Sequence, residues 1–293
     1  MTEEQSKDIA AEQAPIVGLP NDKMLIDPAF ALTELMGIES RLHAANAGVE
    51  VGARFNEQPL IGHREVMVTG YGSTSSRNMR FAHIRLEGMM MSRDQWYGAG
   101  VGKVVDQIHA AYDDRDVQGV LFEVNTGGGE VTAAQMVAAA IQERPKPVLA
   151  YGHLVASGGI MATMHADEIM ASSPMAQFGS IGVMRTIPTW MFRYYSNYYK
   201  DIYSDHSPNK NRPSREYERT ASMDAWVEEL NELAIAFQEE VKAARPLRGD
   251  TKMTLSGEMF RGKDAKTRGL VDSIGGYQKA FNRLATLARP DRL

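Results

Sequence analysis

Between residues 81 and 171 the sequence alternates short apolar runs with longer stretches of helical periodicity. Strand-like runs cover 81–86, 119–124, 148–151 and 168–171, and helical stretches cover 100–112, 131–142 and 158–165. This alternation is typical of βαβ units, which build a mostly parallel sheet with helices packed against it. A further long helix is predicted for 223–244, where apolar positions recur every three or four residues. The sequence therefore predicts an α/β fold whose ligands gather where strands are followed by helices.

Composition narrows the chemistry that this fold could carry. The chain of 293 residues contains no cysteine, which excludes disulfides, thiolate catalysis and cysteine-based metal sites. A nucleophile must therefore be an oxygen or an amine. The net charge of −5 gives no overall basic field, so neither nucleic acid nor an anionic membrane is an expected partner.

The N-terminal quarter differs from the rest of the chain. Residues 1–20 are polar and predict a mobile tail, and 27–45 predict an amphipathic helix. The turn-forming residues of 71–76 indicate a linker, so we expect an N-terminal extension over 21–76 and one domain over 77–293. The acidic start and the lack of an apolar run of about 20 residues indicate a cytoplasmic protein without a membrane anchor.

Two glycine-rich turns follow predicted strands. In the first, 125–130 (NTGGGE), the glycines allow positive φ and the close approach of a ligand to backbone N–H groups. Such a turn can hold an oxyanion or a phosphate, although neither common phosphate-binding glycine motif is present. The alternative is a tight turn that simply requires glycine.

The second turn, 155–159 (VASGG), places Ser157 at the predicted start of a helix, beside the amide of Gly158. Ser157 is a candidate nucleophile, with the amide of Gly158 directed at the carbonyl oxygen under attack. The alternative is an ordinary serine N-cap. For the base, His153 and His165 are more readily explained as structural residues, which leaves lysines near the aromatic segment 194–203.

Four segments, in this order, resemble the signal peptide peptidase A family of serine proteases, which includes phage head-maturation proteases. They are 125–129 (NTGGG), 156–159 (ASGG), 179–183 (GSIGV) and 262–272 (GKDAKTRGLVD). The resemblance covers about 81–281 and implies a ClpP/crotonase-like fold. It further implies a serine endopeptidase without metal or other cofactor.

The resemblance also implies roles for individual residues. Ser157 matches the family's nucleophile, and Lys210 lies about fifty residues later, where the family has its base, whereas Lys200 lies too early. Ser180 matches the serine that orients the lysine. The oxyanion would be held by the amide of Gly158 and that of Gly128 or Gly129.

The sequence allows several biological roles. The expected role is a phage or prophage protease that cuts scaffold and capsid proteins and assembles as a cyclic homo-oligomer. Alternatives are a soluble bacterial signal-peptide-peptidase-like protease, a crotonase-like acyl-CoA enzyme, and a non-catalytic protein that keeps the fold. ClpP itself is set aside, because its histidine base would fall at Gly182.

Overall fold

The computed structural model describes residues 24–26, 66–68, 79–94, 100–187 and 198–289. The predicted helix at 27–45, the linker at 71–76, the tail at 1–20 and the domain boundary at 76 lie outside these ranges. In the part of the N-terminal quarter that the structure describes, there are two short strands, β1 (Met24–Ile26) and β2 (Val66–Val68).

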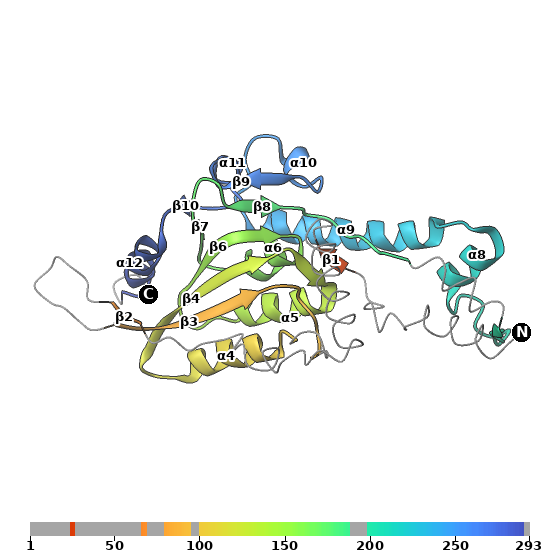
Figure 1. The fold of residues 1–293 in the computed structure, drawn as a ribbon, viewed down its shortest axis with the longest axis horizontal. Coiled ribbons are helices and arrows are strands. Elements are labelled where there is room, and N and C mark those ends of the chain that lie inside the picture. The colour runs from red at the N-terminus through yellow and green to blue at the C-terminus, as the bar shows by residue number, and fades with distance from the viewer. Residues whose placement is uncertain (1–23, 27–65, 69–78, 95–99, 188–197, 290–293) are drawn as a thin grey trace, which may run out of the picture.

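A mostly parallel sheet forms the body of the molecule (Figure 1). Its central strands are β3, β4, β6 and β7, which pair in parallel in the order β7-β6-β4-β3. The strand β10 adds in parallel to β7, whereas β2 adds antiparallel to β3. The strand β8 pairs in parallel with the end of β6 and antiparallel with β9. Bounds are β3 Met79–Glu87, β4 Val117–Thr126, β5 Gly128–Glu130, β6 Val148–Ala156, β7 Glu168–Ala171, β8 Gln177–Gly179, β9 Met259–Arg261 and β10 Ser273–Ile274.

Helices cover both faces of this sheet. The bounds are α4 Gly102–Asp113, α5 Val131–Gln142, α6 Gly158–Thr163, α8 Arg212–Thr220, α9 Asp224–Ala244, α10 Thr251–Thr254, α11 Gly262–Thr267 and α12 Tyr277–Leu287. The α/β class with a mostly parallel sheet is confirmed. All four predicted strands, and the four predicted helices that fall within the described ranges, are present, with ends that differ by a few residues.

The strands form two hydrophobic layers because successive side chains point to opposite faces. On β4, Phe122 belongs to the main core with α4, α5 and α6, whereas Leu121 packs with Phe81 and with Phe281 of α12. Phe237, in the second half of α9, extends the main core. The central strands are thus covered on both sides, which explains the mainly apolar runs that mark them in the sequence.

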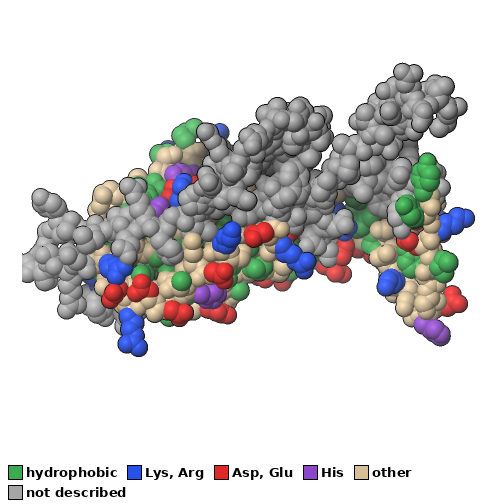
Figure 2. Space-filling model, turned by 60° about the horizontal axis from the view of Figure 1, so that its bottom comes forward, with side chains coloured by type: hydrophobic (Ala, Val, Ile, Leu, Met, Phe, Trp, Pro, Cys, Tyr) green, Lys and Arg blue, Asp and Glu red, His purple; other side chains and the backbone are tan. Residues whose placement is uncertain are grey.

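The first half of α9 and the helix α8 project from the body as an arm (Figure 1). Within the arm, Tyr217 of α8 packs on Trp226 of α9 with ring centroids 5.5 Å apart. The described part of the face shown in Figure 2 carries interspersed acidic and basic side chains, in keeping with the small net charge. Within the described ranges, no helix combines the length and the apolar character needed to cross a bilayer.

Candidate active site

Ser157 lies in the single-residue turn between β6 and α6, in a conformation that L-residues seldom adopt. Its φ of 54° and ψ of −113° lie outside the common regions for a residue with a Cβ. The side chain makes no N-capping hydrogen bond, so the alternative of an ordinary cap is not supported. Instead the Oγ donates to the carbonyl oxygen of Gly182 at 3.2 Å, and the residue is 1% exposed. Strained backbone at a buried serine is characteristic of functional sites.

The pairing of β6 with β8 places Ser180 next to Ser157. Ala156 is opposite Gly179 in the register, so the two serines follow the ends of neighbouring parallel strands. The Ser157 N–H donates to the Gly179 carbonyl at 2.8 Å. Ser180 also has positive φ, at 52°, and its N–H donates to the carbonyl of Glu258 at 2.8 Å. The structure thus brings together two of the residues that the sequence singled out.

The first glycine turn lies directly beside the second, because β4 and β6 are neighbours. A Cβ on Gly159 would lie 2.8 Å from Cγ2 of Thr126, so glycine is needed for this close approach. Gly128 has a φ of 101°, and its N–H donates to Oγ1 of Thr126 at 3.0 Å. The two turns therefore lie side by side, and the amide of Gly128 is engaged within its own loop.

Gly129 lies in β5, which is not a strand of the main sheet and which pairs with Met90. The N–H of Met90 donates to the Gly128 carbonyl, and the N–H of Glu130 donates to the Met90 carbonyl, each at 2.9 Å. A Cβ on Gly129 would lie 2.0 Å from the Met90 carbonyl oxygen. Only glycine therefore fits at this position.

Lys210 and Lys200 lie on or beside the projecting arm and are both exposed. Lys210 occupies the turn that leads into α8, and its backbone N–H donates to the carbonyl of Ser207 at 3.1 Å. Figure 1 shows α8 well separated from β6 and α6. Within the described residues, the Ser157 hydroxyl bonds to Gly182 and the Lys210 N–H to Ser207, and no hydrogen bond joins Lys210 to Ser157 or Ser180.

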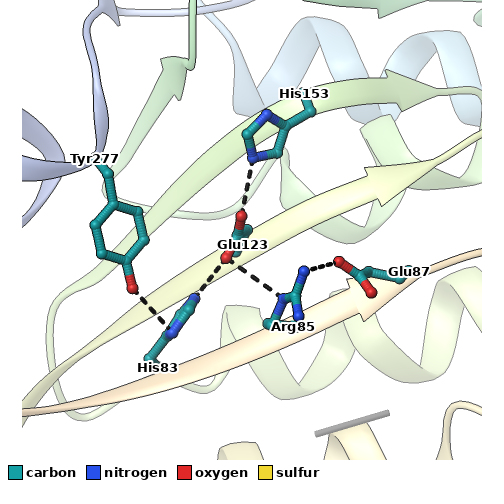
Figure 3. Close-up of polar contacts among 6 residues, drawn as sticks. All are labelled: His83, Arg85, Glu87, Glu123, His153 and Tyr277. Atoms are coloured by element: carbon teal, nitrogen blue, oxygen red, sulfur yellow. Dashed lines mark hydrogen bonds and ion pairs between the residues drawn. The ribbon is translucent and has the colours of Figure 1, made fainter. Parts of the chain in front are cut away.

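The candidate histidines are engaged elsewhere. His153 Nε2 pairs with Glu123 Oε1 at 2.9 Å, and His83 Nε2 pairs with the other carboxylate oxygen at 2.7 Å (Figure 3). The hydroxyl of Tyr277 in α12 lies 3.0 Å from His83 Nδ1. His153 therefore belongs to a cross-strand cluster rather than to Ser157. His165 lies beyond the end of α6, where burial lowers its pKa.

The cluster around Glu123 was not anticipated from the sequence. The hydrogen bond from His83 is the largest cause that lowers the pKa of Glu123 to about 2, and His153 and Arg85 act in the same direction against the effect of burial. The cluster ties β3, β4, β6 and α12 together at the sheet face (Figure 3). Its partners are set by strand register, so only a paired sheet could have revealed it. Among the described side chains, no three or more His, Asp or Glu residues are arranged to hold a metal ion.

Comparison with known proteins connects this geometry to a family. The model of peptidase family S49 matches residues 140–290, which include Ser157, Ser180 and Lys210. The MJ0651 protein of Methanocaldococcus jannaschii is 32% identical over 194 residues, covering 60% of this chain and 58% of that protein. Protease 4 of Salmonella typhi is 28% identical over 219 residues, covering 71% of this chain and 34% of that enzyme.

Among solved structures, the 1510-N membrane-bound stomatin-specific protease, in a mutant form, gives a TM-score of 0.41 at 12% identity, covering 68% of this chain and 81% of that one. The match spans 58% of the length of the MJ0651 protein and 34% of the length of Protease 4. The family match covers more than half of this chain and includes the turn that holds Ser157. This chain belongs to peptidase family S49.

Proposed function

We propose that this protein is a serine endopeptidase in which Ser157 is the nucleophile and Lys210 the base. The observation that carries the proposal is the backbone of Ser157, which holds a buried hydroxyl in a strained, glycine-rich turn beside the first glycine turn. Family membership adds independent support.

In the proposed reaction, neutral Lys210 accepts the hydroxyl proton while the Oγ of Ser157 attacks the peptide carbonyl. The amide of Gly158, with that of Gly128 or Gly129, holds the negative charge that develops on the carbonyl oxygen. The C–N bond then breaks as the lysine returns a proton to the departing amine. Water, deprotonated by the same lysine, hydrolyses the acyl-enzyme and regenerates Ser157.

The separation of Lys210 from Ser157 within one chain leads us to propose that the dyad forms between neighbouring copies. Several large apolar side chains are exposed on the arm or next to it, as expected of a surface that another copy covers. They are Tyr198, Tyr199, Ile202, Met223, Val227 and Ile235. Ile202 is 96% exposed and lies close to Lys210 in sequence. A head-to-tail contact forms a ring when its rotation closes, and we propose such a ring, as in the expected cyclic homo-oligomer.

Complementation between two inactive variants tests this proposal. Ser157→Ala supplies an intact lysine, and Lys210→Ala supplies an intact serine. If each site takes its two residues from different copies, an equimolar mixture has wild-type pairs at about a quarter of its interfaces and regains cleavage of a fluorogenic casein. A mixture as inactive as its components would contradict a shared site, while activity in either variant alone would contradict the role of the changed residue.

For the biological role, we propose that the protease cleaves phage scaffold and capsid proteins. The alternative, a signal-peptide-peptidase-like protease, is favoured by the likeness to Protease 4. The genes that flank this one distinguish the two roles. Portal and major capsid genes would support capsid maturation, and their absence would favour the alternative.

A further inference from the structure

A short strand from the N-terminal quarter of the chain lies against the candidate active site. The strand β1 pairs antiparallel with β5, with Leu25 opposite Gly129 and Ile26 opposite Gly128. It also contacts α5 and α6, and α6 is the helix that begins directly after Ser157. The segment therefore lies between the first glycine turn and the helix that follows the second.

The edge of β5 that β1 occupies can be identified from the backbone hydrogen bonds. Met90 takes one edge of β5 through the Gly128 carbonyl and the Glu130 N–H. Successive backbone groups of a strand point in opposite directions, so the N–H and C=O of Gly129 face the other edge, toward Leu25. Because Gly129 is one of the two candidate oxyanion donors in this loop, β1 lies on the edge that presents that amide.

We infer that this edge of β5 is where an extended peptide binds before cleavage, and that β1 is an internal competitor for it. The inference rests on the proposed function for its link to cleavage. When an extended peptide adds to a strand edge, backbone hydrogen bonds supply the affinity, and pockets for alternate side chains supply the specificity. Two segments cannot use the same backbone groups at once, so β1 must leave before a peptide in trans can pair with Gly129.

The expected consequence is a weaker apparent affinity for peptides. Affinity falls in proportion to the fraction of molecules in which the edge is free. A substitution that prevents β1 from pairing should therefore tighten peptide binding without any change in the residues of the site.

A binding measurement in the Ser157→Ala background tests the inference without relying on catalysis. The probe is a fluorescein-labelled peptide with the sequence of residues 20–30, and the readout is fluorescence anisotropy. Leu25→Pro in the full chain removes the N–H that faces Gly129, whereas the matched control Leu25→Ala keeps it. We expect the proline variant to bind the probe at least about threefold more tightly than the alanine variant. Equal affinity of the two variants would overturn the inference.

A reversible cross-link provides a second test in one protein. Met24 is opposite Glu130 in a pair that lies outside the hydrogen-bonded ring, where Cα atoms are about 4.5 Å apart and a disulfide fits. Because the chain has no cysteine, the variant Met24→Cys/Glu130→Cys can form only this bond within the chain. Oxidation should abolish probe binding and reduction should restore it. Probe binding that is the same in both states would refute the competition.

Cleavage assays on the same variants separate this inference from the proposed function. With Ser157 intact, Leu25→Pro should cleave a fluorogenic peptide faster than Leu25→Ala. If neither cleaves but the binding difference is present, the proposed function fails and the competition at β5 stands. If both cleave at equal rates and bind the probe equally, the competition fails and the proposed function stands.

Discussion

The backbone of Ser157 leads to a quantitative prediction, in which glycine at this position is more stable than alanine. With φ at 54° and ψ at −113°, a residue that carries a Cβ is strained by about 1–3 kcal/mol. Alanine keeps the Cβ and the strain, whereas glycine removes both. Both variants lose the 3.2 Å hydrogen bond to Gly182 equally, so that loss cancels in the comparison.

An opposing effect comes from the unfolded chain. Glycine has more unfolded conformations than alanine, which lowers the stability of the glycine variant by about 0.4–1 kcal/mol. When the entropy cost is subtracted from the strain that glycine relieves, Ser157→Gly is expected to be more stable than Ser157→Ala by about 1 kcal/mol. For a chain of this size, that difference corresponds to a Tm higher by roughly 2–4 °C.

Thermal unfolding of the two variants at equal protein concentration measures the difference, and equal concentration matters because self-association raises Tm. Ser256 supplies a matched control. It is exposed, is not among the described non-glycine residues with positive φ, and its Oγ donates to the carbonyl of Met253 at 2.9 Å. At that position the order should reverse, with alanine more stable than glycine. If Ser157→Ala is at least as stable as Ser157→Gly, the argument from backbone strain is wrong.

Three further predictions concern charge, the base and the first glycine turn. The hydrogen bond from His83, with smaller contributions from His153 and Arg85, lowers the pKa of Glu123 in the folded state from 4.5 to about 2. These contacts therefore stabilise the fold fully above pH 4.5 and progressively less as the pH falls toward 2. Glu123→Gln should remove this part of the pH dependence of the free energy of unfolding, which amounts to no more than about 2 kcal/mol after solvent screening. Urea titrations between pH 2 and 7 measure it, and an unchanged acid dependence would argue against the cluster. Lys210→Arg should abolish cleavage of casein because arginine does not release a proton, whereas Lys200→Ala should keep most of the rate; the reverse result would move the base to Lys200. Gly129→Ala should abolish activity and lower Tm, because its Cβ would lie 2.0 Å from a backbone carbonyl oxygen; a wild-type Tm and rate would contradict that packing.

The sequence predicted those parts of the fold that have a local signal. The strands β3, β4, β6 and β7 are marked by apolar runs because the sheet is covered on both faces. By contrast, β5 has the sequence Gly-Gly-Glu, which carries no apolar pattern, and its pairing with Met90 and β1 depends on segments distant in sequence. The other unpredicted strands of the described residues also have only two or three residues each, too short to show a period; they are β1, β2, β8, β9 and β10.

The candidate site also contains residues with a local sequence signal and one, Lys210, whose position has no such signal. Ser157 and the glycine turns are recognisable because each lies in a local strand-to-helix motif, and the pairing of β6 with β8 then brings Ser180 beside Ser157. The place of Lys210 could not be predicted from spacing in sequence. Its position depends on how the arm projects from the body, and our proposal places its partner on another copy.

The central claim is that Ser157 is a nucleophile, and labelling with a fluorophosphonate probe tests it most directly. The probe forms a covalent adduct only with an activated serine, so its site can be identified by mass spectrometry of the digested protein. We predict a single adduct on the peptide that contains Ser157, absent from the Ser157→Ala variant and much reduced in Lys210→Ala. An assembled protein that takes up no probe at Ser157, or a Ser157→Ala variant that is labelled as strongly as the wild type, would contradict the account.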